Sequence, residues 1–490
     1  MTGRNPPRSA SADLVGSAAA ILGGSLAALA ASLAIRVVIA RTLSPAELGA
    51  LLLGISIVSF AGVSASLGLR AAGARRVSAL LAGGDAAGAA GAARTSLAAG
   101  ALSGAVVTAV AAAAALVPPL AGGKLPDGLL MALTPAVFGL AAGTAVWGVS
   151  QGFGDTRGRA LWRDSLGGLL RLAGVGLAAL AGGGLLALAL GWALGSLCGE
   201  TLFTLYGRRR GWFTAATGDG ARPAGRDRAL LASLPPFAGN TSIHQVVRWL
   251  DMLLVGLLAP LSVVALYGLA QSVYRVLGMV QGAAAHRFLP LASAAVARGD
   301  GAALAAAYRQ TRDLTFRFLW LPLAPCLLCP RQVTVLAFGA EYAAAGPALQ
   351  VLAGALAASA VCGYTEDLLY ARDRPGAVFV RVSGVSVLTA VMLLVLVPRW
   401  GALGAAVATA AALVAGTLFD LAMLGAGLTR AVLGRSLASP VLVSLPALVA
   451  AAVATALALP PLATVALVGA AAAPPALARL LDLLPRTAAG

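Results

Sequence analysis

The sequence is short of charge for its length. Only 11% of its 490 residues are Asp, Glu, Lys or Arg, whereas a typical soluble domain has about 25%. Hydrophobic residues make up 59% of the chain, and the mean hydropathy is +0.90. Long apolar stretches recur along the whole length, each near the roughly 20 residues that a membrane-spanning helix needs. This composition excludes a soluble globular protein and predicts an all-α polytopic membrane protein.

Acidic, histidine and cysteine side chains are also few, with 18 Asp and Glu, two His and four Cys. The only C-x-x-C, Cys326 and Cys329, has no further ligands close in sequence, so neither a metal site nor a cofactor is predicted. No P-loop occurs, which excludes a built-in ATPase. Every outward loop is too short for the sizeable domain that a membrane glycosyltransferase or polymerase would need. We therefore expect a protein that is not an enzyme.

Basic residues outnumber acidic ones, which gives a net charge of +17, and Lys124 is the only lysine. In a soluble protein this excess would suggest nucleic acid as a partner, but here it reflects orientation in the membrane. Most basic residues lie in loops on the side of the N-terminus. The opposite loops hold only Arg41, Lys124, Arg331 and Arg399. The positive-inside rule then predicts a cell (cytoplasmic) membrane protein with both termini in the cytoplasm and no nucleic-acid partner.

The apolar stretches predict about 14 transmembrane helices. Among them are Ala50–Ala72, Leu314–Leu336, Ala343–Tyr370, Ala377–Val397 and Gly401–Gly425. The predicted organisation is a cytoplasmic tail at 1–14, a first six-helix lobe at 15–206, a basic cytoplasmic linker at 207–230, a second six-helix lobe at 231–425, and two additional transmembrane helices with a tail at 426–490.

A weak internal repeat supports the two lobes. Gly158, Arg163 and Ser165 recur as Gly376, Arg381 and Ser383, at an offset of 218 residues, and the match of the two arginines is the most informative. Because each repeat would contain an even number of helices, the lobes should have parallel topology and be related by an axis along the membrane normal.

Polar residues within apolar spans point to a pathway. The segment Ser233–Gly256 follows the most basic part of the chain, and it carries Asn240, His244, Arg248 and Asp251 within roughly an 80° arc of one helix face. The next predicted helix carries Gln271, Tyr274 and Arg275 on one face, and the first two helices carry Arg36 and Arg70. Charged groups inside a membrane usually face a cavity or a partner. We therefore expect a cationic cavity for a ligand with an anionic head.

The candidate ligands of that anionic head are the cavity residues Arg275, Arg36, Arg70, Arg248, Gln271, Tyr274 and Asn240, with Asp251 and His244 as candidates for ion or proton coupling. Among them Arg275 is the first choice, because no acidic residue lies beside it. Structural alternatives stay open: Arg36 and Arg70 could snorkel to lipid headgroups, Arg248 and Asp251 could neutralise each other, and His244 could serve helix packing. Glu200, Glu366, Asp367 and Asp420 are assigned no role.

Several segments in a fixed order resemble the polysaccharide and lipid-linked oligosaccharide flippases of the multidrug/oligosaccharidyl-lipid/polysaccharide (MOP) exporter superfamily, which includes the MATE transporters. The similarity spans about Val15 to Gly425, and it rests on ARTLSPAELG (Ala40–Gly49), SLPP with Asp251 and Gly256, LYGLAQ (Leu266–Gln271), FLPLASAAVARGD (Phe288–Asp300), AFGAEYAAAGPALQVL (Ala337–Leu352) and PRWGALGAAVATA (Pro398–Ala410).

The resemblance implies two six-helix bundles that alternate access around a central cavity. It also implies a polyprenyl-pyrophosphate-linked sugar as substrate, membrane lipids as surroundings, and polysaccharide synthase or polymerase components as candidate partners. A peptidoglycan-precursor flippase and an ion-coupled multidrug exporter of the same superfamily are the alternatives. A non-transporting membrane scaffold is a third, but it would leave the polar stripes without a purpose.

Overall fold

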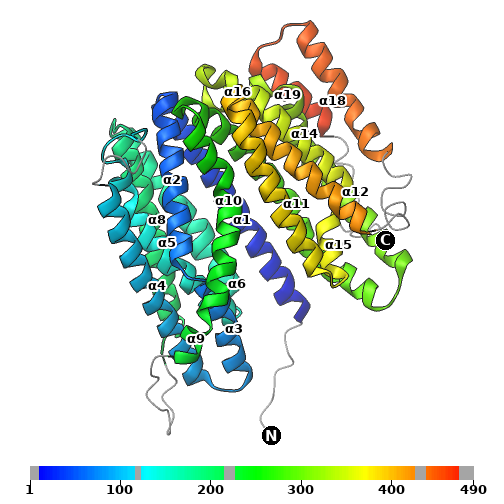
Figure 1. The fold of residues 1–490 in the computed structure, drawn as a ribbon. Coiled ribbons are helices and arrows are strands. Elements are labelled where there is room, and N and C mark those ends of the chain that lie inside the picture. The colour runs from blue at the N-terminus through cyan, green and yellow to red at the C-terminus, as the bar shows by residue number, and fades with distance from the viewer. Residues whose placement is uncertain (1–9, 116–122, 215–226, 425–437, 474–490) are drawn as a thin grey trace, which may run out of the picture. The chain divides into compact units, whose positions relative to one another are not determined.

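The structure is a computed structural model, and it describes residues 10–115, 123–214, 227–424 and 438–473 of the chain. In these ranges every regular element is a helix (Figure 1). The chain forms two compact units, Met1–Leu253 and Leu254–Gly490. The division into a tail, two six-helix lobes, a linker and two additional helices, which was expected from the sequence, stays a prediction.

In the first unit, α5 (Leu129–Gly152) packs against α2, α3, α4 and α8, so it holds the centre of this part of the fold. The other elements of this unit are α1 (Ala10–Thr42), α2 (Pro45–Ala65), α3 (Leu69–Ala82), α4 (Ala86–Ala115), α6 (Thr156–Gly158), the π-helix η2 (Arg159–Leu166), α7 (Gly167–Leu180), α8 (Leu185–Arg209), α9 (Arg228–Ala232) and α10 (Leu234–Leu258), whose last residues belong to the second unit.

The start of α2 is specified locally by a capping box. The Ser44 hydroxyl accepts the Glu47 N–H, the Glu47 carboxylate accepts the Ser44 N–H at 3.0 Å, and Pro45 occupies the first helical turn. A proline there costs no hydrogen bond, because the first N–H groups of a helix have no partner within it.

The expected helix Ala50–Ala72 is interrupted. α2 ends at Ala65 and α3 begins at Leu69, with left-handed backbone at Leu67 (φ 49°) and Gly68 (φ 74°). Glycine suits this position for two reasons: its φ is positive, and a Cβ there would collide with the backbone of Phe237 in α10. Arg70 therefore lies beyond a break rather than on one continuous helix with the serines of α2.

Glycines bring α7 and α8 into direct backbone contact. Gly191, Gly195 and Gly199 are spaced four residues apart, so they form one stripe along α8. A Cβ added at any of them would lie within 3.0 Å of a backbone atom of α7. Small residues at this spacing let two membrane helices approach closely, and dispersion contacts then stabilise the pair.

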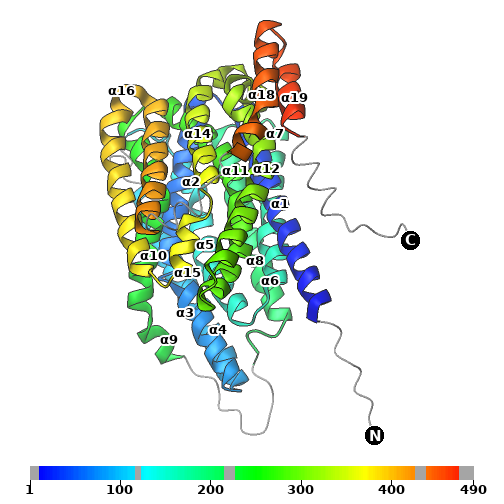
Figure 2. The ribbon, with the colours of Figure 1, turned by 90° about the vertical axis from the view of Figure 1, so that its right-hand side faces the viewer.

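The second unit contains α11 (Leu261–Ala297), α12 (Gly301–Leu328), α13 (Pro330–Phe338), the 3₁₀-helix η3 (Ala340–Ala345), α14 (Gly346–Cys362), α15 (Thr365–Ala371), α16 (Pro375–Leu424), α18 (Ala438–Ala456) and α19 (Pro461–Ala472). The α18–α19 hairpin packs on α12, and α19 also contacts α13; its orange and red helices are conspicuous in Figure 2.

Two of three helix breaks in this unit differ from the expected helices. The expected helix Leu314–Leu336 bends by 95° between α12 and α13. The expected helix Ala343–Tyr370 stops at Cys362, because Gly363 adopts φ 81° before α15 begins. Within α16 the residue Gly401 (φ 53°) separates two helical segments, and this break was expected from the sequence.

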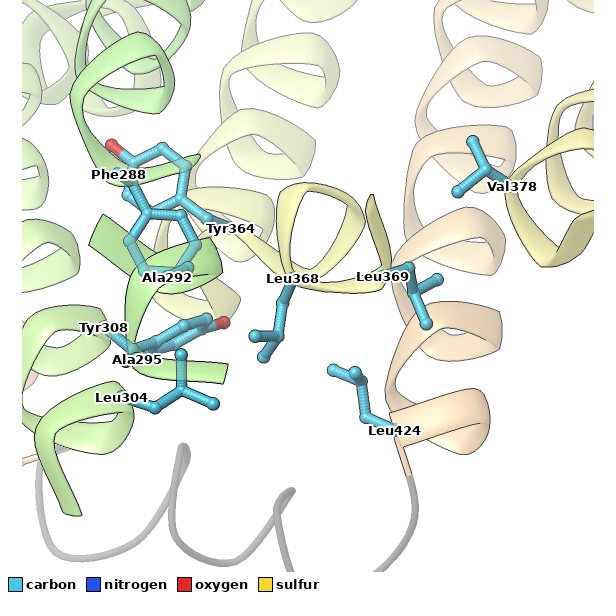
Figure 3. Packing of buried hydrophobic residues seen from close by; sticks show 10 residues of the cluster. All are labelled: Phe288, Ala292, Ala295, Leu304, Tyr308, Tyr364, Leu368, Leu369, Val378 and Leu424. Atoms are coloured by element: carbon cyan, nitrogen blue, oxygen red, sulfur yellow. The ribbon is translucent and has the colours of Figure 1, made fainter. Parts of the chain in front are cut away.

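Aromatic and aliphatic side chains form a buried cluster in the second unit (Figure 3). The ring of Phe288 stacks on Tyr364 at a centroid distance of 5.3 Å and meets Tyr308 edge-on at 5.6 Å. The Tyr308 hydroxyl donates to the Cys362 carbonyl, so the end of α14 is tied to α12. Leu368 and the other members of the cluster fill the space between α11, α15 and α16.

The chain is an all-helical, multi-span membrane protein. By length and hydropathy, seven helices in the described residues could cross a membrane, or eight if the bent pair of α12 and α13 is one span. The more specific expectation of about 14 spans stays a prediction.

Candidate functional site

Three arginine side chains surround the indole ring of Trp147 in the first unit. The guanidinium carbon of Arg70 lies 4.3 Å from the ring centroid, and those of Arg159 and Arg163 each lie 4.6 Å from it. A guanidinium within about 6 Å of an aromatic face is attracted by the ring quadrupole. The arginines come from α3 and η2 and the tryptophan from α5, so tertiary packing gathers this cationic cluster.

The π-helix η2 supplies two of the three cations around this ring and one of the anions. Arg159 pairs with Asp164 at 3.2 Å. Arg163 forms a bidentate pair with Glu200 of α8, with nitrogen–oxygen distances of 3.0 and 3.1 Å. Two parallel charge-assisted hydrogen bonds are stronger and more directional than one. Short π-helical segments often mark functional sites, because they change the direction of side chains within a helix.

The Arg163–Glu200 pair is largely shielded, with side chains 14% and 11% exposed. It borders a cavity of about 80 Å³ whose walls include Arg171 and Ser196. The hydroxyl of Ser196 is buried and has no hydrogen-bond partner among the described residues. A polar cavity of this size has room for a few water molecules or one small ion.

In the second unit, Arg381 lies between two carboxylates. Its Nε atom is 3.2 Å from Oδ1 of Asp420, and a terminal nitrogen donates to Glu366. The other carboxylate oxygen of Asp420 accepts the hydroxyl of Thr365 at 3.0 Å. Asp420 is only 2% exposed, so its charge depends on these partners, because an unpaired buried charge is costly.

The two ion clusters occupy equivalent places in the sequence repeat. Arg163 and Arg381 are separated by the offset of 218 residues, and each pairs with an acidic residue of a later helical segment, Glu200 in α8 and Asp420 after the break in α16. Their net charges differ. The first cluster has three arginines against Asp164 and Glu200, whereas the second has one arginine against Glu366 and Asp420. Each unit thus contains an equivalent arginine–carboxylate pair. Positive charge is in excess around the pair of the first unit, and negative charge around that of the second.

The structure places the sequence-predicted residues of the first unit as follows. Arg36 is half-buried in α1, Arg70 is exposed in α3, and Arg248 is exposed and Asp251 half-buried in α10. The Asp251 carboxylate accepts the N–H of Met252 at 2.8 Å. The side chains of Asn240 and His244 lie outside the described residues. Of this set, only Arg70 belongs to the Trp147 cluster.

On α11, Gln271 is 6% exposed and donates to the hydroxyl of Tyr267 at 3.2 Å. That hydroxyl is 2.9 Å from the hydroxyl of Thr409 in α16. The chain of polar groups joins two helices of the second unit, so Gln271 has a packing role there. Tyr274 and Arg275 are half-buried on the same helix. A cavity that combines these residues with those of the first unit stays a prediction.

The sequence analysis gave no role to several residues that form these two ion clusters. Trp147, Glu200 and Asp420 were passed over, because each meets its arginine partner only through packing of separate helices. Arg159 was passed over as well, although its partner Asp164 lies in the same π-helix. The usable signal was the repeat: it singled out Arg163 and Arg381, and in each repeat an acidic residue follows at a similar distance.

No family model matches the sequence, and no curated protein matches it. Solved structures do match. A structure of the lipid II flippase MurJ in an inward closed conformation is similar with a TM-score of 0.69 at 13% identity, covering 94% of this chain and 99% of that one. An inward-facing multidrug resistance MATE family transporter of the MOP superfamily has a TM-score of 0.66 at 17% identity, covering 84% and 99%.

A MOP superfamily transporter from Pyrococcus furiosus, whose binding pocket is described as having reversed polarity, matches with a TM-score of 0.53 at 15% identity over 85% of this chain and 96% of that one. The chain thus has the fold of these MurJ and MATE transporter structures. The structures that it resembles are transporters, not enzymes.

Proposed function

We propose that this chain is a transporter that flips a polyprenyl-pyrophosphate-linked oligosaccharide from the cytoplasmic to the outer leaflet by alternating access, for cell-surface polysaccharide biosynthesis. It would reside in the cell membrane with both termini in the cytoplasm, and synthase or polymerase components are candidate partners. The proposal combines the fold with the charge of the embedded polar residues.

The observation that carries it is the extent of the likeness to the lipid II flippase. That alignment covers 94% of this chain. Residues 1–424 are a smaller share of the 490 residues, so the alignment must include residues after Leu424. The inward-facing multidrug transporter covers 84%, which does not require such an extension. The larger coverage by the lipid II flippase supports a flippase over a multidrug exporter.

The charges agree with an anionic head group. A pyrophosphate that crosses the bilayer must exchange water for fixed cations, because an unpaired anion is costly in low dielectric. Arg275, Arg36, Arg70 and Arg248 are the candidate ligands, supported by Gln271, Tyr274 and Asn240, and the prenyl tail can stay in lipid. Arginine suits phosphate, because its planar fork of donors can bind two oxygens at once. Asp251 and His244 are the candidates for coupling to an ion.

Two alternatives share this fold. A peptidoglycan-precursor flippase is favoured by the lipid II flippase match, and it would use the same cations for a different sugar. An ion-coupled multidrug exporter is favoured by the carboxylate excess around Arg381 in the second unit. These possibilities differ in the charge and lipid anchor of the transported molecule.

The test is transport in proteoliposomes. Purified protein is reconstituted with fluorescent undecaprenyl-pyrophosphate oligosaccharide, fluorescent lipid II or a cationic dye, and movement between leaflets is followed by quenching with an impermeant reductant. Faster flipping of the oligosaccharide lipid than in protein-free vesicles is expected. Flipping of lipid II alone would select the peptidoglycan alternative, and dye transport alone the exporter. Gene deletion should also cause the oligosaccharide lipid to accumulate on the cytoplasmic leaflet.

A further inference from the structure

A groove runs along the first unit between α4 and α8. Both helices pack against α5, whereas they have little contact with each other in the described residues. At one end of the groove a cavity of about 610 Å³ is lined by residues that include Arg94, Leu97, Ala101, Arg208 and Phe213. A second cavity of about 210 Å³ shares the wall residues Leu97 and Ala101 with the first, so the two lie next to each other.

The first end of this groove is cationic. Arg94 of α4 and Arg208 of α8 are both exposed, and no carboxylate of the described residues lies within ion-pair distance of either. Two guanidinium groups at one mouth provide several N–H donors for a phosphate, and such charge-assisted hydrogen bonds are short and strong.

The groove then becomes mainly apolar. Beyond the shared residues Leu97 and Ala101, its walls include Phe138 and Ala142 of α5 and Leu197 of α8, with Glu200, Thr201 and Thr204 as the polar residues. The neighbouring outer face of α4 carries highly exposed apolar side chains, Leu102 at 69%, Val106 at 55% and Val110 at 62%. In a membrane protein such a face is in contact with acyl chains. The groove therefore combines a cationic end with a lipid-accessible apolar channel.

An aromatic cluster lies beside the cationic end of the groove. Trp212 follows α8, stacks with Phe153 at 6.1 Å and meets Tyr206 edge-on at 5.7 Å. Tyr206 in turn stacks with Trp162 at 5.2 Å. Tryptophan and tyrosine concentrate at membrane–water interfaces. Arg208 is two residues after Tyr206, so the cationic mouth lies beside this aromatic cluster.

We propose that this groove binds an anionic glycerophospholipid. Its headgroup phosphate lies between Arg94 and Arg208, and one acyl chain follows Leu97 and Ala101 toward Phe138. The apolar part of the groove borders Glu200, the partner of Arg163, but the headgroup site at Arg94 and Arg208 does not include the Trp147 cluster. The proposal does not depend on which substrate the protein transports.

The test is lipid binding to the full-length protein in detergent, measured by native mass spectrometry with phosphatidylglycerol and phosphatidylcholine. The variant R94Q/R208Q removes both cations, and R298Q/R309Q is the control, since it removes two exposed arginines of the second unit. Each basic residue near an anionic headgroup contributes about a fivefold gain in affinity, so R94Q/R208Q should bind phosphatidylglycerol on the order of 25-fold more weakly. The control and the phosphatidylcholine signal should stay unchanged. Equal loss in both variants would overturn the proposal.

A second variant tests the apolar part. A101W keeps both arginines but fills the groove where the two cavities meet. It should weaken phosphatidylglycerol binding at least about tenfold, since an acyl segment of a few CH₂ groups loses its place. Inorganic phosphate should not displace the lipid from the unmodified protein. If A101W binds the lipid normally, or if phosphate competes with it as well as a second lipid does, the groove is at most a phosphate site and the proposal is wrong.

Discussion

The carboxylate of Glu200 occupies the space that a side chain at position 143 would need, so Gly143 of α5 and Glu200 of α8 depend on each other. Because Glu200 holds Arg163, this missing Cβ also keeps the Trp147 cluster in place. A glycine inside a helix costs about 1 kcal/mol relative to alanine, and here the room that it leaves is used by a buried ion pair.

Gly143→Ala should therefore destabilise the protein, although alanine favours helices. Displacing Glu200 leaves Arg163 without its bidentate partner, and losing one side of a buried pair costs on the order of 3 kcal/mol. The control is Gly176→Ala on α7, where an added Cβ meets nothing within 4 Å. Thermal unfolding in detergent should show a lower midpoint for the first variant only, and equal midpoints would contradict the dependence.

In the second unit, Arg381 has one buried and one exposed carboxylate partner, and we expect their contributions to stability to differ. The side chain of Asp420 is 2% exposed and that of Glu366 is 43% exposed, and both pair with Arg381. Asp420→Ala should cost on the order of 3 kcal/mol, whereas Glu366→Ala should cost about 1 kcal/mol or less. Similar losses of unfolding free energy in both variants would show that burial does not decide this difference.

A partly buried ion pair between Arg76 and Asp227 predicts how the stability of the fold changes with pH. Asp227 accepts Nε of Arg76 at 2.8 Å and caps α9 through the Leu230 N–H at 3.0 Å. Burial raises the pKa of the Asp227 carboxyl, but the hydrogen bonds and charge of Arg76, with the backbone N–H groups, outweigh burial, so the pKa lies below its ordinary value.

A lowered carboxyl pKa in the folded state stabilises the protein above the unfolded-state pKa, and this gain is lost as pH falls through the folded-state value. Asp227→Asn should lower stability at neutral pH by about 1 kcal/mol, and the gap from the unmodified protein should close below about pH 4. Unfolding curves at several pH values measure it. A gap that persists in acid would mean that Asp227 acts without its charge.

Transport depends on Arg275 if the proposed capture of phosphate is right. Arg275→Ala should abolish flipping while the protein still folds and inserts, and Arg275→Lys should keep a fraction, since the charge survives but the fork of donors does not. The measurement is the flipping rate at equal protein per vesicle. An unchanged rate for Arg275→Ala would remove this residue from the mechanism.

Topology can be tested with single cysteines in a background that lacks the four native ones. Cysteines at Lys124 and Arg399 should react with an impermeant thiol reagent from outside intact cells, and one at Arg209 should not, because basic loops stay in the cytoplasm. The reverse pattern would overturn the proposed orientation.

The sequence predicted the features that follow from composition and from periodicity over a whole span. These features are the helical class, the many apolar spans, the break at Gly401, and the equivalence of Arg163 and Arg381 in the sequence repeat. It did not predict the π-helical turn of η2, because a 100° periodicity assumes α-helical register. Nor did it predict the break at Leu67, since leucine gives no signal for positive φ. The partner of Arg163 lies 37 residues away and is chosen by packing.

The glycine contact between α7 and α8 bears on why the chain is so rich in glycine. Two causes are possible, a mutational bias of the genome and selection for close helix packing. The chain has 60 glycines, and a mutational bias of the genome toward small residues would scatter them without regard to structure. Those facing a neighbouring backbone, such as Gly191 and Gly195, are under steric selection, whereas Gly176 and Gly384 meet open space. Over evolutionary time the first group should resist drift and the second should drift freely toward alanine or serine.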